Sequence, residues 1–145
     1  MFDRIAAKYN GLNRVLSLGL DKGWRRKLVK MVQKQGAVDV LDVATGTGDV
    51  AIALSKLPQL KIDAVDLSTQ MLAVQAKELE KLKLSDRITL KVADAENLPF
   101  ESQFDAVTVA FGVRNFAQLE KGLSEMHRVL RNGGCLYILE TSRPK

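Results

Sequence analysis

The chain is poor in the residues that cross-link or interrupt a fold. It has 145 residues but only one cysteine, Cys135, three prolines and one histidine, and aromatic residues make up 6% of it. A single cysteine can form neither an internal disulfide nor a zinc site alone, so a reducing cytoplasm is the expected compartment. No apolar run is long enough to cross a membrane, and the charged N-terminus lacks a secretion signal. The length predicts one domain with its own core.

The positive charge balance allows several kinds of partner. The formal net charge is +5, which suits nucleic acid or an anionic membrane and is also ordinary for a small enzyme. Aromatic residues show no stacking pattern among the basic ones, so nucleic-acid binding is not expected. One predicted helix carries a basic stripe of Lys22, Arg26, Lys30 and Lys34. A solvated helix face and a surface resting on lipid headgroups both explain this stripe.

The hydrophobic pattern changes along the chain. Residues 1–36 are predicted to be helical, with a second helix over about 21–35 that ends at Gly36. Strands are then predicted over 38–44, 61–67, 88–94, 104–111 and 135–140, with helices over 51–57, after a Ser68 cap, and over 116–130. Strands that alternate with helices pair in parallel through right-handed crossovers. The predicted fold class is α/β, with a doubly wound, mostly parallel Rossmann-like sheet of five strands.

Glycines and carboxylates gather directly after the predicted strands. Gly46 and Gly48 follow the first strand, where they allow a tight turn and the approach of a ligand to backbone N–H groups. Packing of the strand against the next helix would explain the same glycines. Asp66 ends the second strand about twenty residues further on, the spacing at which a carboxylate accepts from both ribose hydroxyls. Together these residues predict an adenosine site.

The glycine loop alone does not separate two adenosine cofactors. Its sequence GTGDVA also satisfies the G-x-G-x-x-A pattern of NAD-dependent dehydrogenases. Asp42 and Asp49 flank the loop, and negative charge there disfavours a pyrophosphate but favours a sulfonium and an ammonium group. Asp94 follows the third strand and can accept from an adenine amino group beside the Ala95 N–H, although a local turn cap is a competing role. The balance favours S-adenosylmethionine, and no metal site is predicted.

Five segments of the chain read VLDVATGTGDVAI, AVDLSTQML, ADAENLPF, FDAVTVAFGVRN and EMHRVLRNGG. Together these segments closely resemble the class I S-adenosylmethionine-dependent methyltransferases. With the N-terminal MFDRIAAKYNGLNRVLS, the FGVRN segment more narrowly resembles the quinone-biosynthesis C-methyltransferases. The resemblance covers essentially the whole chain and implies methyl transfer to a ring carbon of a prenylated quinol, demethylmenaquinol or a ubiquinone-precursor benzoquinol. Because chains of this family continue past the fifth strand, the sequence is expected to be shortened at its C-terminus, with that strand left as an open edge.

The resemblance also assigns roles to residues. The cofactor-binding set comprises Asp42, Ala44, Gly46, Thr47 and Gly48 for the methionine part, Asp66 for the ribose, Asp94 and Ala95 for the adenine, and Leu67 and Ala110 as further contacts. Arg114 would stabilise a phenolate, Asn115 would orient a ring oxygen, and Tyr9 would act as a polar lid group. Capping of the following helix is the competing role for Arg114 and Asn115. His127 and Cys135 are assigned to the structure.

Residues 1–36 are expected to form an N-terminal helical lid and substrate segment, and residues 37–145 the cofactor-binding core of a single domain. The expected location is cytoplasmic, with peripheral contact at the inner face of the membrane. Three alternatives stay open. They are a nicotinamide dehydrogenase, a methyltransferase for another small molecule, and a non-catalytic module that binds S-adenosylmethionine or RNA.

Overall fold

A computed structural model describes residues 14–19, 23–110 and 118–140 of the chain. The helices are α2 (Trp24–Gln35), α3 (Asp49–Leu54), α4 (Thr69–Leu82) and α5 (Leu119–Val129). The strands are β1 (Arg14–Gly19), β2 (Asp39–Val43), β3 (Lys61–Asp66), β4 (Ile88–Val92), β5 (Phe104–Ala110) and β6 (Leu130–Glu140). All five predicted strands are therefore present, and α2 ends at Gly36 as predicted, with φ 81° at that glycine.

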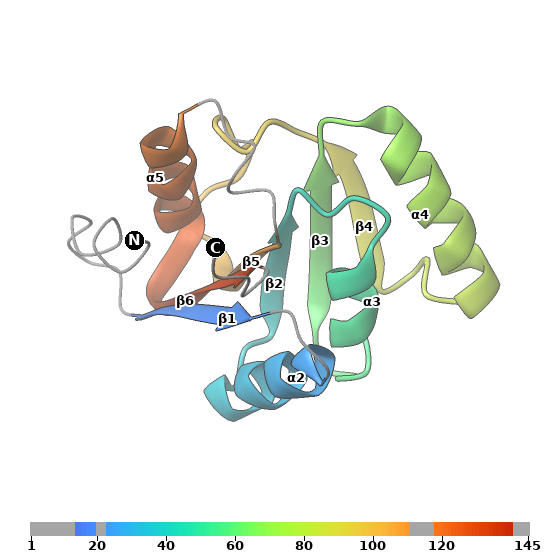
Figure 1. Cartoon of the computed structure of the whole chain (residues 1–145), viewed down its shortest axis with the longest axis horizontal. Helices are drawn as coiled ribbons and strands as arrows, with labels where there is room; N and C mark the ends of the chain where they lie inside the picture. Colours follow the sequence, from blue (N-terminus) through green and yellow to red (C-terminus); the bar gives the residue numbers. More distant parts are fainter. Residues whose placement is uncertain (1–13, 20–22, 111–117, 141–145) are drawn as a thin grey trace.

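The strands form one twisted sheet in the order β1-β6-β5-β2-β3-β4 (Figure 1). Every neighbouring pair runs parallel. From β2 the chain first moves outward through β3 to β4, and then returns to the other side of β2 with β5 and β6. This reversal makes β2 the switch point of a doubly wound sheet, so the carboxyl ends of β2 and its neighbours are where a ligand is expected.

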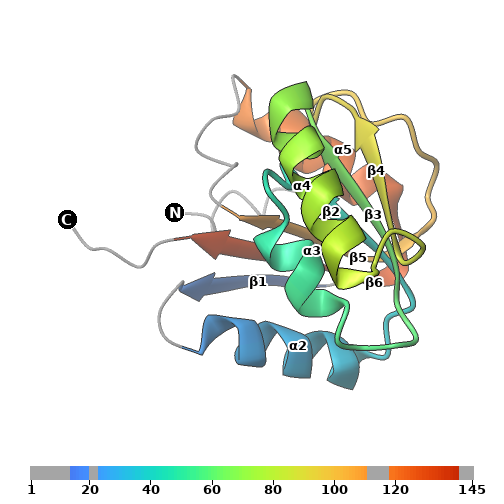
Figure 2. The same cartoon turned by 90° about the vertical axis from the view of Figure 1, so that its right-hand side faces the viewer.

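Helices cover both faces of the sheet. In Figure 2, α3 and α4 lie on the side nearer the viewer and α5 lies behind the sheet. Buried residues of α2, α3 and α4, among them Leu28, Leu54 and Leu79, pack on one face in a single cluster. Leu123 and Met126 of α5 belong to a second cluster on the other face. The sheet therefore has a packed core on each face, with the strand ends between the two layers of helices.

The structure corrects the helical prediction for residues 1–36 at one segment. Arg14–Gly19 is a strand, β1, which pairs in parallel with Cys135–Glu140 of β6. The alternation of Leu16, Ser17 and Leu18 suits a strand, and the free edge of β6 supplies the hydrogen-bonding partner that local propensity does not see. The expectation that β6 would be an open edge is therefore wrong. Residues 1–13 lie outside the described residues, and the lid role stays a prediction.

The junction between α5 and β6 also differs from the prediction. The helix ends at Val129, and Leu130 already belongs to β6. The pairing of β5 with β6 shifts register between Phe104 and Ala106, because the segment before Cys135 bulges. Gly133 lies in this bulge with φ 87°, a conformation that glycine adopts without strain.

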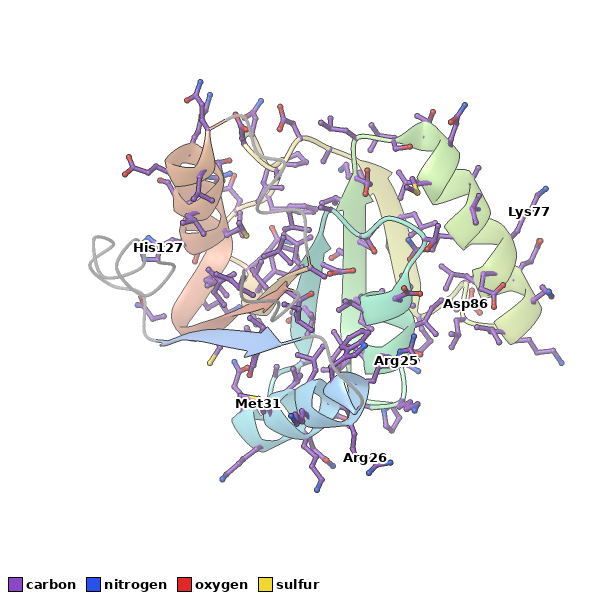
Figure 3. The ribbon with its side chains drawn as sticks, in the orientation of Figure 1. Arg25, Arg26, Met31, Lys77, Asp86 and His127 are labelled. Atoms are coloured by element: carbon purple, nitrogen blue, oxygen red, sulfur yellow. The ribbon has the colours of Figure 1, made fainter. Side chains whose placement is uncertain are left out.

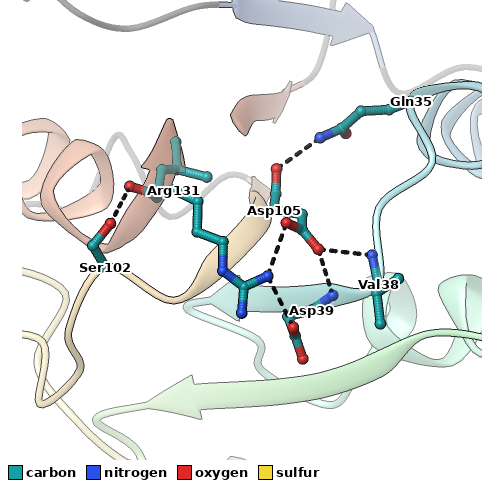
Figure 4. A network of polar contacts seen from close by, with 7 residues as sticks. Gln35, Val38, Asp39, Ser102, Asp105 and Arg131 are labelled. Atoms are coloured by element: carbon teal, nitrogen blue, oxygen red, sulfur yellow. Dashed lines mark hydrogen bonds and ion pairs between the residues drawn. The ribbon is translucent and has the colours of Figure 1, made fainter. Parts of the chain in front are cut away.

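A polar network ties the amino ends of β2 and β5 together (Figure 4). The Asp105 carboxylate accepts from the N–H groups of Val38 and Asp39 at 2.9 and 3.0 Å. Arg131 Nη1 lies 3.0 Å from carboxylate oxygens of both Asp39 and Asp105. Burial opposes ionisation of Asp105, but these donors together hold its pKa below the usual value. This network lies at the sheet edge opposite the strand ends that carry the glycine loop.

Candidate functional site

The glycine loop leaves the carboxyl end of β2 in an unusual backbone conformation. Ala44, Gly46 and Gly48 have φ angles of 56°, 59° and 99°. Positive φ at alternate residues coils the loop tightly before α3 begins at Asp49, and glycine takes up this conformation most easily. The N–H of Thr47, between the two glycines, has no acceptor among the described residues. The loop thus presents an unused donor to its surroundings.

The two glycines face different environments. A Cβ placed on Gly46 would meet no atom within 4 Å, so this side of the loop is open. A Cβ on Gly48 would lie 2.6 Å from the Cδ of Gln75 on α4. Gly46 therefore leaves its side of the loop accessible, whereas Gly48 packs closely against a helix.

Asp42 supports the loop from inside the protein. Its side chain is 1% exposed, and its two carboxylate oxygens each accept a hydroxyl at 2.7 Å, from Thr45 and from Thr108. Burial raises the pKa of Asp42 to about 6 although these two hydrogen bonds lower it, and the nearby Asp66 and Asp49 raise it further. A carboxyl group with this pKa changes charge just below neutral pH, so the buried negative charge of the site depends on pH.

Asp66 joins the loop to the start of α4. Its carboxylate accepts from the N–H groups of Gly46 at 2.7 Å and Ser68 at 2.9 Å. The side chain is only half-buried, and each carboxylate oxygen can accept more than one donor. Asp66 can therefore hold the loop and still receive ligand hydroxyls. Ser68 caps α4 through Met71 N, as predicted, and Leu67 beside it is 66% exposed.

Asp94 and Ala95 follow β4 at the same edge of the sheet. One oxygen of Asp94 accepts from Glu96 N at 2.9 Å, so the local turn that competed with the adenine role is present. The other carboxylate oxygen and the Ala95 N–H have no partner among the described residues. The pair thus offers one acceptor and one donor side by side. Ala93 N donates to Asp66 O at 3.1 Å and links this turn to β3.

Other predicted residues lie at the margin of this region or beyond it. Ala110 is the last residue of β5 and is half-buried. Tyr9, Arg114 and Asn115 lie outside the described residues. His127 is on α5, away from α3 and α4 (Figure 3), and Cys135 is buried within β6. These last two positions fit the structural roles expected of them.

Sequence reasoning missed two residues that build the site, Thr108 and Gln75, and the bond from Thr45 of the predicted loop to Asp42. Thr45 and Thr108 hold both oxygens of Asp42, and Gln75 donates through Nε2 to Gly46 O at 2.9 Å and to Thr45 Oγ1 at 3.3 Å. Thr108 could have been found from the pairing of β2 with β5, where it lies beside Asp42. Gln75 stands between Leu72 and Leu79 on the buried face of α4. A polar residue at that helical spacing is the signal that could have identified it.

The assembled site carries several carboxylates, and its Thr47 and Ala95 N–H groups have no acceptor in the described part of the chain. Segments 42–49, 66–68 and 93–95 carry four aspartates and no lysine or arginine, although Arg25 of α2 and Lys56 line a pocket together with Thr47 and Asp49. Such a site suits a ligand with positive charge and sugar hydroxyls rather than a phosphate. In the described part of the chain, no group of three or more His, Cys, Asp or Glu residues could hold a metal ion.

Known proteins match this chain in sequence and in fold. The model of the ubiE/COQ5 methyltransferase family matches residues 1–145. A protein of Geobacter sp. (strain M21) named ubiquinone/menaquinone biosynthesis C-methyltransferase UbiE is 48% identical over 99% of this chain and 63% of its own length. A demethylmenaquinone methyltransferase of Bacteroides fragilis is 47% identical over 99% of this chain and 60% of its own length. The chain thus spans about three fifths of these relatives.

Solved structures support the fold. A putative methyltransferase from Bacillus halodurans superposes with a TM-score of 0.73 at 33% identity, covering 83% of this chain and 52% of its own. A putative S-adenosyl-L-methionine-dependent methyltransferase from Methanococcus maripaludis gives a TM-score of 0.71 at 24% identity, covering 83% of this chain and 64% of its own. The doubly wound parallel sheet predicted from the sequence is confirmed.

Proposed function

Because the chain belongs to the ubiE/COQ5 methyltransferase family, we propose that its strand-end site binds S-adenosylmethionine for methyl transfer to a ring carbon of a prenylated quinol. Demethylmenaquinol, which becomes menaquinol, is the proposed acceptor. Two relatives are named for quinone methylation. The observation that carries the proposal is the acidic strand-end site, whose three segments hold four aspartates, no lysine or arginine, and two N–H groups without an acceptor among the described residues.

The residues of this site fit the parts of the cofactor. Asp66, half-buried with lone pairs to spare, would accept from the ribose hydroxyls. The free oxygen of Asp94 and the Ala95 N–H would pair with the adenine edge. The Thr47 N–H and the buried negative charge of Asp42 would hold the charged methionine part. Leu67, exposed beside Asp66, would cover the sugar and base.

The cofactor would supply the reactive methyl group, and the protein would supply alignment and charge stabilisation. When bound, S-adenosylmethionine supplies a methyl group on a positively charged sulfur that leaves readily as a thioether. The protein must align the acceptor carbon with that methyl and stabilise a phenolate on the quinol. Arg114 is proposed to stabilise the phenolate, Asn115 to orient a ring oxygen and Tyr9 to close over the site. All three follow from the resemblance and lie outside the described residues.

Methyl transfer tests this proposal directly. The chain, incubated with S-adenosylmethionine labelled in the methyl group and a short-tailed demethylmenaquinol, should yield labelled menaquinol. Arg114→Ala should keep cofactor affinity and slow the transfer, because a phenolate forms only during the reaction. Cofactor binding without turnover of any quinol would favour the non-catalytic module instead. Loss of cofactor binding in Arg114→Ala would contradict the assigned role.

We also propose that the exposed face of α2 contacts the membrane in which an oily quinol resides. Lys22, the first residue of the predicted basic stripe, lies outside the described residues. Arg26, Lys30 and Lys34 are exposed on this face, and none of them has an ion-pair partner among the described residues. Arg26 projects from α2 away from the sheet (Figure 3). A groove of about 480 Å³ lies along this face. Its charged lining residues are Arg25, Arg26, Lys30 and Lys56, and none of its lining residues is a carboxylate. No helix in the described segments is long and apolar enough to cross a bilayer.

Vesicle flotation separates this face from a merely solvated one. Replacing Arg26, Lys30 and Lys34 by glutamine should weaken partitioning onto vesicles with anionic phospholipid by roughly 100-fold, at about 1 kcal/mol for each charge near the surface. The control removes the same charge from α4 and its C-cap, by glutamine at Lys77, Lys81 and Lys83. If both variants partition onto vesicles equally weakly, net charge alone explains the binding. If neither variant partitions more weakly than the parent chain, the membrane proposal is wrong.

A further inference from the structure

Gln75 is a buried polar residue in the middle of α4 that packs against the glycine loop. Its side chain is 0% exposed, and its neighbours on the buried face of the helix are leucines. Burial of a glutamine is costly unless both ends of its amide are hydrogen-bonded. A leucine would fill this position without that cost, so the amide calls for an explanation.

The amide nitrogen of Gln75 binds the loop at two points. Nε2 donates to Gly46 O at 2.9 Å and to Thr45 Oγ1 at 3.3 Å. Because the Gly46 carbonyl can only accept, the atom that faces it must be the nitrogen of the amide. The Thr45 hydroxyl in turn donates a hydrogen bond to the Asp42 carboxylate at 2.7 Å. One side chain of α4 therefore fixes both the backbone of Gly46 and the hydroxyl that holds the buried carboxylate.

The amide oxygen of Gln75, in contrast to the nitrogen, accepts no hydrogen bond from the described residues. This atom, Oε1, is buried, and it lies against Gly48, at 2.7 Å from where a Cβ would stand. A Cβ at position 48 would collide with the amide where it now lies, so Gly48 leaves it room. A side chain that retains an unpaired oxygen to keep two bonds to a loop is placed for the loop rather than for stability.

Through Gly46, Gln75 also affects Asp66, the residue proposed to bind the ribose. Gly46 uses its carbonyl for Gln75 and its N–H for Asp66 at 2.7 Å. The orientation of this one peptide segment therefore couples α4 to the Asp66 carboxylate and to the Asp42 support. If Gln75 no longer donates, the Gly46 carbonyl is free to turn, and the donor that orients Asp66 turns with the loop.

We propose that Gln75 is a positioning residue, which locks the glycine loop in the conformation that receives the cofactor. This inference rests on the proposed function of the site, since it assumes that the loop and Asp66 bind S-adenosylmethionine. Gln75 itself touches no cofactor in this scheme. It acts through Gly46 and Thr45.

Two substitutions test the role with affinity and stability measured separately. Gln75→Met keeps the length of the side chain but has neither the donor nor the unpaired oxygen. We expect affinity for S-adenosylhomocysteine, measured by calorimetry, to fall roughly tenfold, because both hydrogen bonds from Gln75 to the loop are lost. The urea midpoint should stay close to that of the parent chain, because the buried unpaired oxygen is lost as well. The exposed Gln33→Met on α2 serves as the control and should change neither quantity.

Gln75→Glu supplies a pH-dependent readout that a packing role would not produce. An ionised glutamate would place an acceptor against Gly46 O and add negative charge beside Asp42, so affinity at pH 8 should fall by more than in Gln75→Met. When protonated, the same group can again donate to Gly46 O. Lowering the pH from 8 to 5.5 should therefore bring the affinity of Gln75→Glu back toward that of the parent chain, whereas Gln75→Met should show no such recovery.

The outcomes separate this role from the proposed function. If the parent chain fails to bind S-adenosylhomocysteine, the cofactor site itself is wrong and the positioning role falls with it. If the parent chain binds but both variants bind equally well, only the positioning role is overturned. A loss of affinity that runs parallel to a lowered urea midpoint, without recovery of Gln75→Glu at low pH, would assign Gln75 to core packing alone.

Discussion

Replacement of Asp42 by asparagine should make the free protein more stable at neutral and alkaline pH. Asparagine keeps the size of the side chain and can still accept from Thr108, but it carries no charge. The pKa of Asp42 rises from 3.8 to about 6 on folding because the group is buried. A shift of that size corresponds to roughly 3 kcal/mol of cost for holding the ionised group in the folded state.

The sign of the pH dependence follows from the raised pKa. The folded protein binds the proton more tightly than the unfolded chain, so this contribution to stability is fully present below pH 3.8. It is lost as the pH rises through about 6. Between pH 5 and pH 8 the loss should amount to roughly 1.4 kcal/mol. The side chain introduced by Asp42→Asn does not titrate, so the difference in unfolding free energy between the two proteins should change by that amount across the same range.

Urea unfolding followed by circular dichroism at several pH values measures this difference. Titrating groups that do not interact with Asp42 are common to both proteins and cancel in the comparison. The gain in stability should come with weaker binding of S-adenosylmethionine above pH 6, because the buried negative charge near the sulfonium is gone. Parallel stability curves for the two proteins between pH 5 and pH 8 would refute the account of Asp42.

Two further substitutions probe the loops around the site. Gly46→Ala should lower stability by about 1 kcal/mol, because residue 46 has φ 59°, which costs a non-glycine residue about that much. The added methyl group would enter the open side of the loop, so cofactor affinity measured by calorimetry should fall more than tenfold. Unchanged affinity would show that the cofactor does not bind beside Gly46. Arg128→Met should lower the free energy of unfolding in urea by about 1 kcal/mol, since the guanidinium donates to Leu98 O and Phe100 O at 2.7 Å. An unchanged free energy of unfolding would show that these carbonyls need no support from α5.

The sequence allowed the central strands and their polar ends to be predicted because they obey local rules. β2 and β5 read as short apolar runs, since both faces of a parallel strand are buried. The residues directly after β2, β3 and β4 then fall at one edge by topology alone. The glycine loop and Asp66 could be placed together on this basis, and the structure joins them by the bond from Gly46 N to Asp66.

The features that were missed depend on contacts distant in sequence. β1 exists as a strand because β6 offers it an edge 121 residues further along the chain, as in the pairing of Arg14 with Cys135. The bond from Thr108 to Asp42 spans 66 residues and follows only from strand register. Gln75 reaches back 29 residues to Gly46 O. Local propensity cannot anticipate such pairings, because the energy that selects them comes from tertiary packing.

A competitive calorimetric titration tests the central claim most directly, namely that an acidic strand-end site selects a cationic adenosine cofactor free of phosphate. The chain should bind S-adenosylmethionine and S-adenosylhomocysteine, should not bind NADH, and should lose both ligands when Asp66 is replaced by alanine. Binding of NADH in preference to S-adenosylmethionine, or undiminished binding by Asp66→Ala, would contradict it.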